Sequence, residues 1–87
     1  MISSDIDHHK ISNKIMDLLD KIDDGKTICP SEVARSLSPE HWRDWMPSVH
    51  RAANEMVNSG SIIITQKGIP VSPNNRKGAY RIKKNRK

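Results

Sequence analysis

Apolar side chains recur every three to four residues through the first part of the chain, which is the spacing of amphipathic helices. The first stripe predicts a helix over residues 7–23. Its apolar positions are Ile11, Ile15, Leu18, Leu19 and Ile22. Asp5 and Asp7 lie near the predicted start, where carboxylates favour the positive end of the helix dipole. Gly25 follows the predicted end and is suited to terminating a helix.

The stretch KTICPSEVARSL, residues 26–37, predicts a second helix over residues 30–37. Pro30 suits the first helical position, because its missing N–H would be unpaired there anyway. Glu32 comes three residues after Cys29 and can fold back on that capping position. A reactive thiol at Cys29 would need a His or Lys base beside it. The sequence identifies no such base, so we expect a reduced structural cysteine.

Two prolines shape the next segment, which we interpret as a short helical turn over residues 39–45 and a third helix over residues 47–59. Ser38 can cap the turn, and Pro47 is expected to break the run because proline removes a backbone hydrogen bond and clashes with the preceding turn. Gly60 closes the third helix. The inner face of that helix is predicted to be Val49, Ala52, Ala53, Met56 and Val57.

After Gly60 the pattern changes to β-branched residues, and SIIITQKG predicts a strand over residues 61–68. A polar turn rich in Pro, Asn and Gly follows, and then a second short strand in which Tyr80 and Ile82 face inward. The fold class is therefore α+β. We expect a winged helix-turn-helix, with three main helices, a short helical turn and a C-terminal β-hairpin wing. It forms a single domain over residues 1–87, with an ordered core of about 7–82 and a basic tail at 83–87.

Composition narrows the class of protein. With 87 residues, 34% of them hydrophobic and no Phe, the chain can bury only a small core. One cysteine excludes an intramolecular disulfide framework and a multi-cysteine zinc site. The N-terminus lacks the apolar core of a signal peptide, and no apolar run approaches the roughly 20 residues that cross a bilayer. We therefore expect a cytoplasmic protein without a membrane partner.

Charge is distributed unevenly along the chain, although the net charge is only +5. Residues 1–50 hold six Lys or Arg and nine Asp or Glu. Residues 51–87 hold nine Lys or Arg, with Glu55 as their sole acid. Polyanions are the natural partners of such a basic end. The alternative is that the terminal RIKKNRK is a solubilising tail.

Several motifs together resemble a domain-of-unknown-function family of small bacterial proteins. The resemblance is carried by KTICPSEVARSL, by WRDWMPSVHRAANEMVNSGSIIITQKGIPVSP and by KGAYRI, and it spans about residues 11–82. It implies a winged-helix-like fold of bacterial origin and carries no established activity. His50 stands where that family usually has Arg, so a fixed positive charge is missing at the start of the third helix.

The outer face of the third helix is the first candidate site. Major-groove readers need donors and acceptors on the first turns of a helix, and Ser48, His50, Arg51 and Asn54 can supply them. Basic residues of the hairpin would act on phosphates. These are Lys67, Arg76, Lys77 and Arg81. The alternative is that Arg51 only pairs with Glu55 on a solvated helix face.

Other candidate groups point away from catalysis. Trp42 and Trp45 share one side of a helical turn, and we expect core anchors there, with a partner-protein contact as the alternative. The histidines do not converge in a spacing that zinc requires, and no nucleophile–base pair is identifiable. We therefore predict no enzyme, no metal and no cofactor.

The sequence favours a small protein that binds double-stranded DNA, as a transcriptional or accessory factor. Helix 47–59 would enter the major groove, and the basic wing would lie along the backbone. The alternative is a protein–protein interaction module that uses the winged-helix surface or the Trp42/Trp45 turn, including docking of a homodimer.

Overall fold

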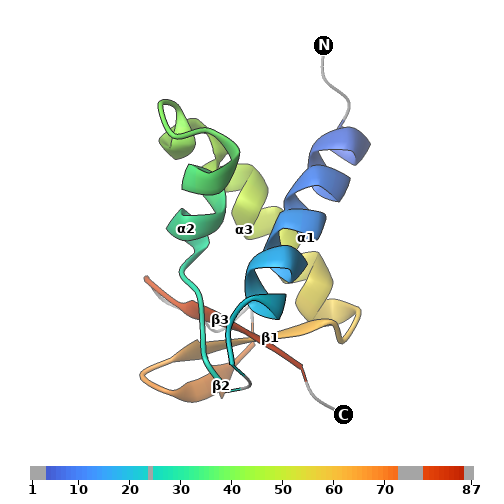
Figure 1. Ribbon diagram of the computed structural model, residues 1–87. Coiled ribbons are helices and arrows are strands. Elements are labelled where there is room, and N and C mark those ends of the chain that lie inside the picture. The colour runs from blue at the N-terminus through green and yellow to red at the C-terminus, as the bar shows by residue number, and fades with distance from the viewer. Residues whose placement is uncertain (1–3, 24, 73–77, 86–87) are drawn as a thin grey trace.

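Three helices pack on one face of a three-stranded antiparallel sheet in the computed structural model, which describes residues 4–23, 25–72 and 78–85 (Figure 1). The α+β class is therefore as expected. The elements in chain order are α1 (Ser4–Asp20), α2 (Pro30–Leu37), α3 (Trp42–Asn58), β1 (Ile62–Gln66), β2 (Ile69–Val71) and β3 (Arg81–Lys84). The strand order across the sheet is β2–β1–β3.

α1 begins and ends three residues earlier than the predicted span of 7–23. Its end is a tighter turn, in which the backbone N–H groups of Lys21 and Ile22 donate to carbonyls three residues back, each at 3.3 Å. Gly25 has a φ of +86° and lies beyond this turn. The apolar stripe nonetheless faces the core, because Ile11, Ile15 and Leu19 are buried.

α2 spans residues 30–37 as predicted. Pro30 occupies the first helical position, and the Glu32 carboxylate accepts a hydrogen bond from the backbone N–H of Cys29 at 3.2 Å. This is the capping contact that the spacing of the two residues indicates. Val33 and Ala34 are buried.

The prediction that Pro47 separates two helices is wrong, because α3 is continuous from Trp42 to Asn58. Pro47 is the sixth residue of α3, so its missing N–H deprives only the Arg43 carbonyl of a helical hydrogen bond. The turn before Pro47 is held in place by packing. Trp42, Trp45 and Met46 all pack against the core cluster.

The two ends of α3 follow local capping rules. At the start, the Ser38 hydroxyl accepts a hydrogen bond from the backbone N–H of His41 at 3.3 Å. At the end, Ser61 N–H donates to Met56 O at 2.9 Å and Gly60 N–H donates to Val57 O at 3.0 Å. This pair of bonds is a Schellman motif, and Gly60 adopts the positive φ of 84° that the motif requires. Gly60 therefore closes the helix as predicted.

The sheet contains one strand more than the predicted hairpin. β1 lies within the predicted strand, but the chain then reverses at Lys67 and Gly68, whose φ angles are both positive, 54° and 79°. Positive φ at both central positions is the conformation of tight hairpin turns. β2 follows and pairs with β1, with Pro70 opposite Thr65. Pro70 is tolerated because β2 is an edge strand.

β3 pairs with the other side of β1, with Ile82 opposite Ile64 and Arg81 opposite Thr65. Ile28 makes an isolated bridge to Ile82, with two backbone hydrogen bonds of 2.8 Å each. As predicted, Tyr80 and Ile82 face inward, where they are 3% and 0% exposed. The predicted turn residues 73–77 lie outside the described residues.

The core fills the space between the three helices and the inner face of the sheet. Isoleucine supplies most of its large side chains, which agrees with the absence of Phe. The largest fully buried side chains are Ile11, Ile15, Ile62, Ile64, Ile82, Val33 and Val49.

Replacement of Pro47 by Ala should raise the free energy of unfolding. The N–H gained by residue 47 can donate to the Arg43 carbonyl, and Pro47 is exposed, so no core contact changes. Proline costs about 3 kcal/mol relative to alanine inside a helix. Alanine also gives the unfolded chain more conformational entropy than proline does, and this lowers the gain in stability by about 1 kcal/mol. We expect a gain of about 2 kcal/mol in urea denaturation. A less stable Pro47→Ala protein would contradict this account of α3.

Candidate nucleic-acid interface

The four residues predicted on the third helix differ in how far they reach solvent. Arg51 is exposed, whereas Ser48, His50 and Asn54 are half-buried. His50 Nδ1 and Tyr80 Oη are 2.7 Å apart, so the ring contacts the segment that leads into β3. Arg51 is therefore the most accessible of the predicted groove-reading side chains.

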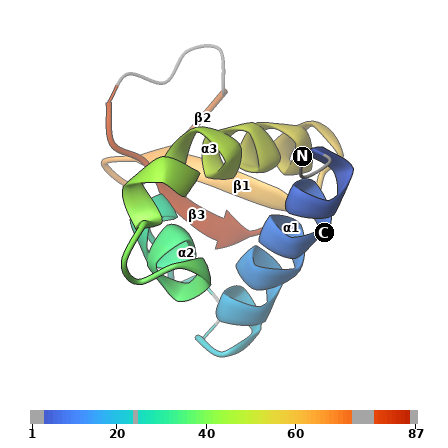
Figure 2. The same cartoon turned by 90° about the horizontal axis from the view of Figure 1, so that it is seen from above.

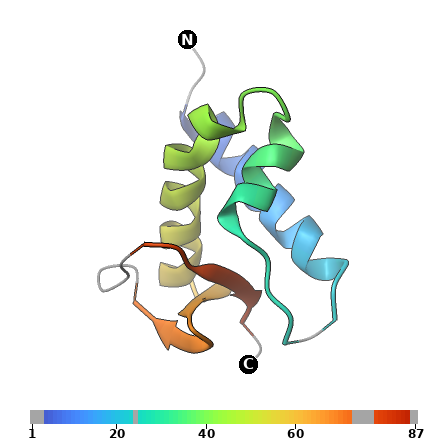
Figure 3. The same cartoon turned by 90° about the vertical axis from the view of Figure 1, so that its left-hand side faces the viewer.

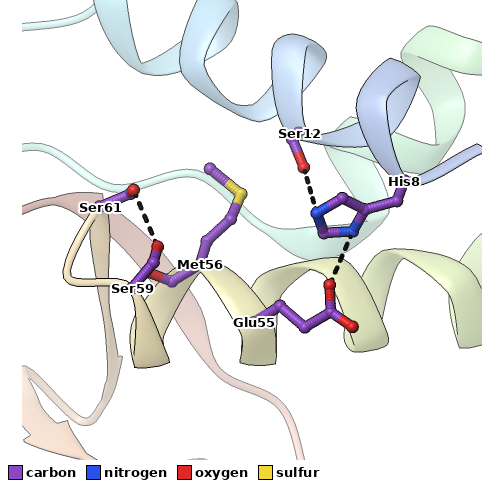
Figure 4. A network of polar contacts seen from close by, with 6 residues as sticks. All are labelled: His8, Ser12, Glu55, Met56, Ser59 and Ser61. Atoms are coloured by element: carbon purple, nitrogen blue, oxygen red, sulfur yellow. Dashed lines mark hydrogen bonds and ion pairs between the residues drawn. The ribbon is translucent and has the colours of Figure 1, made fainter. Parts of the chain in front are cut away.

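Glu55 does not form the ion pair with Arg51 that the alternative interpretation predicts. Its carboxylate lies 3.1 Å from His8 Nδ1 on α1, and the other ring nitrogen of His8 lies 3.3 Å from the Ser12 hydroxyl (Figure 4). Glu55, the only acid in residues 51–87, therefore contacts α1. Arg51 has no carboxylate partner within the described ranges.

Arg81 is held by three hydrogen bonds to neutral acceptors. Its Nε donates to the Thr27 hydroxyl at 2.9 Å, one terminal nitrogen donates to Thr27 O at 3.3 Å, and the other donates to the Cys29 sulfur at 2.7 Å. Thr27 and Cys29 flank Ile28, whose bridge to Ile82 brings them beside Arg81. The guanidinium is fixed in place, but its charge is not neutralised by these partners.

Cys29 is a free, half-buried thiol at the start of α2. Its sulfur accepts a hydrogen bond from Arg81, which cannot act as a general base because it does not deprotonate in proteins. The contact fits the structural role that we expect for Cys29.

A cavity of about 210 Å³, here called the Arg81 cavity, opens beside this cluster. Its lining residues come mainly from the end of β1, the hairpin turn and the segment that leads into β3. Figure 3 shows these segments from the side on which β1 ends. Of the residues that the structure describes, two cationic side chains line the cavity and no carboxylate does. Its lining residues are Cys29, Thr65, Gln66, Lys67, Ala79, Tyr80 and Arg81.

Thr65 is the buried polar residue of this region. It is 5% exposed, and no side-chain hydrogen bond of Thr65 is found among the residues that the structure describes. Buried hydroxyls normally have a partner. An unpaired hydroxyl on the wall of a cavity is a free donor for whatever enters the cavity.

A second, larger hollow of about 520 Å³ lies between the start of α2, α3 and the segment 78–80. Met46, Pro30 and Tyr80 give it a mainly apolar wall, His50 also lines it, and neither Lys nor Arg is found in this wall among the described residues. It shares Cys29, Ala79 and Tyr80 with the Arg81 cavity.

The two tryptophans contact cations and the core. The guanidinium groups of Arg35 and Arg43 lie 4.5 and 5.0 Å from the ring centre of Trp42, and the Lys10 ammonium lies 5.5 Å from that of Trp45. Both rings are half-buried and pack against the core cluster. These contacts favour the predicted role as core anchors.

Of the predicted phosphate contacts, the structure places Lys67 and Arg81 at the same cavity, while Arg76 and Lys77 lie outside the described residues. Sequence reasoning missed Thr27, Cys29 and Thr65 as parts of this cluster. In the described part of the chain, no three His, Cys, Asp or Glu residues converge to hold a metal ion. No helix there is long and apolar enough to span a membrane.

Comparison with known protein families matches residues 8–85 to the family described as "Protein of unknown function (DUF3253)". The match covers nearly the whole chain, so the protein belongs to this family. A comparison with curated proteins gives no match. The predicted resemblance to a family of unknown function is confirmed.

Replacement of Thr65 by Val should stabilise the protein, because the change removes a buried unpaired hydroxyl and keeps the shape of the side chain. We expect about 1 kcal/mol in thermal unfolding. The matched control is Thr27→Val, which deletes the hydroxyl that accepts from Arg81 Nε and should lower stability or leave it unchanged. Destabilisation by Thr65→Val would show that the hydroxyl has a partner in the folded protein.

Proposed function

We propose that this protein binds double-stranded DNA through a winged-helix arrangement, as a transcriptional or accessory factor. The observation that carries the proposal is the pattern of ion pairing. All three ion pairs within the described residues use a side chain of α1, in the pairs Lys21–Asp17, Lys84–Asp20 and His8–Glu55. Asp17 and Asp20 of α1 are thus engaged in ion pairs, while a group of cations elsewhere has no carboxylate partner.

That group comprises Arg51 on α3, Lys67 at the hairpin turn, and Arg81 and Lys83 on β3. None of the four has a carboxylate partner among the described residues. Uncompensated cations spread over a helix and a neighbouring sheet match the charge of a phosphate backbone.

The arrangement of the elements also supports the proposal. α2 and α3 are consecutive helices, the strands follow them, and the bridge from Ile28 to Ile82 ties the start of α2 to the sheet. Figure 2 shows the end of β2 and the approach to β3 on the side of the molecule where α3 lies. A duplex that contacts α3 could therefore reach the strand ends as well.

The alternative function, a protein-interaction module, would use the Trp42/Trp45 turn or the winged-helix surface. Both tryptophans are half-buried, which leaves less of their surface for a partner. The exposed large apolar side chain among the described residues is instead Ile69 on the edge strand, at 65% exposure. A single exposed apolar residue is common on protein surfaces and does not by itself mark a protein interface. We therefore prefer DNA binding to protein interaction as the proposed function.

The first test is the salt dependence of duplex binding, measured by fluorescence anisotropy with a labelled random-sequence oligonucleotide. If about four to six phosphates are neutralised, log K should fall with log salt with a slope of roughly −4 to −5. A binding constant that does not change with salt would falsify the proposal.

The second test compares two variants that each remove one positive charge. Arg51→Gln removes the exposed cation of α3 and should weaken duplex binding about tenfold, which is the range for loss of one good groove contact. Lys21→Gln is the matched control, because Lys21 directly follows Asp20, the last residue of α1. Figure 2 shows that this end of α1 points away from α3. The Lys21→Gln protein should bind as the unmodified protein does. Equal losses in both variants would indicate that net charge alone, and not the α3 surface, governs binding.

A further inference from the structure

We propose that the Arg81 cavity is a phosphate-binding site in which Arg81, Lys67 and Thr65 donate to one phosphate group. The inference deepens the proposed function and rests on it, because it identifies a backbone phosphodiester of DNA as the source of the phosphate. It therefore specifies which residues contact a DNA phosphate, whereas the net charge of the protein does not.

Arg81 is oriented before any ligand arrives. A guanidinium has five N–H donors, and the contacts with Thr27 and Cys29 use three of them. Two donors remain for an anion, which is the number that a bidentate contact with phosphate uses. Because Thr27 and Cys29 are neutral acceptors, they restrict the side chain without cancelling its charge.

The unpaired Thr65 hydroxyl is an independent sign of a ligand. Thr65 lies directly opposite Arg81 in the sheet, so both side chains are on the same face. A hydroxyl that is 5% exposed and lacks a partner among the described residues costs free energy in the unliganded protein. A phosphate oxygen in the cavity would accept its hydrogen bond and remove that cost.

Charge and size define the ligand class. Lys67 adds a second cation to the lining, and no carboxylate lines the cavity in the described part of the chain. Glu32, whose carboxylate accepts a hydrogen bond from the backbone N–H of Cys29, is not a lining residue. At about 210 Å³ the cavity is below the roughly 300 to 1,000 Å³ of pockets that enclose whole ligands. It therefore suits a phosphate group and not a complete nucleoside.

The test is a titration of the full chain with inorganic phosphate, followed by amide and arginine side-chain NMR signals, with NaCl added to keep ionic strength constant. We expect saturable shifts at Thr65, Lys67 and the Arg81 Nε–H. Arg81→Gln should raise the dissociation constant at least about tenfold, and Thr65→Val about fivefold to tenfold. Shifts that do not saturate, or that NaCl alone reproduces, would overturn the inference.

Lys84→Gln is the matched control. Lys84 lies on β3 opposite Ile62, pairs with Asp20 of α1 and does not line the cavity. Its loss removes one charge from the same strand and should change phosphate affinity less than twofold. A loss as large as that of Arg81→Gln would also overturn the inference. The Thr65→Val protein separates loss of the site from misfolding. Its stability is expected to rise while its phosphate affinity falls, so misfolding could not explain the lower affinity.

Duplex binding by the same variants separates this inference from the proposed function. If duplex DNA binds and neither Arg81→Gln nor Thr65→Val weakens it, the phosphate site is wrong and DNA binding stands. If inorganic phosphate saturates the Arg81 cavity but duplex DNA does not bind, the site stands and the proposed function fails. In that case the phosphate belongs to a small molecule and not to nucleic acid.

Discussion

The two backbone hydrogen bonds between Ile28 and Ile82 determine most of what is distinctive in this fold. They fix the segment before α2 against the edge of the sheet and therefore decide where α2 begins. Because side chains alternate across a strand, burying Ile28 between the helices and the sheet turns Thr27 and Cys29 to the opposite face. There they meet Arg81, which flanks Ile82 in the same way. The pairing of Ile28 with Ile82 therefore buries two core side chains and also places Thr27 and Cys29 against Arg81.

The secondary structure was predictable where local rules suffice. α2 has the predicted bounds because its proline, its capping glutamate and its apolar positions lie within eight residues. The two errors on internal structure both concern proline. A break was expected at Pro47, and no strand was expected around Pro70. Proline is costly only where its missing N–H would have made a hydrogen bond and its ring would clash. That depends on its place in the finished helix or sheet, which sequence periodicity alone does not reveal.

The candidate site was predictable only in its charges. Lys67 and Arg81 stand out in a sequence because an acid-free region surrounds them. Thr27, by contrast, lies 54 residues from Arg81 along the chain. Their contact exists because residue 28 joins β3, and one alternating triplet, Thr27 to Cys29, is too short to predict a strand. The same holds for Thr65, whose burial and position opposite Arg81 depend on strand register. Composition therefore suggested the anion that we propose as partner, whereas only the pairing of strands indicates the place that we propose for it.

The neutral partners of Arg81 bear on how strongly such a site can bind. A free arginine on a surface loses side-chain entropy when it binds a ligand, and that loss reduces affinity. Here the loss has occurred during folding, at the start of α2 and the edge of the sheet. An acidic partner would have fixed the side chain equally well but would have competed with the phosphate for its charge. Thr27 and Cys29 fix it without that competition, and the unpaired hydroxyl of Thr65 leaves a further donor unused. The unpaired hydroxyl costs free energy in the unliganded protein, and on our proposal an anion in the cavity would remove that cost.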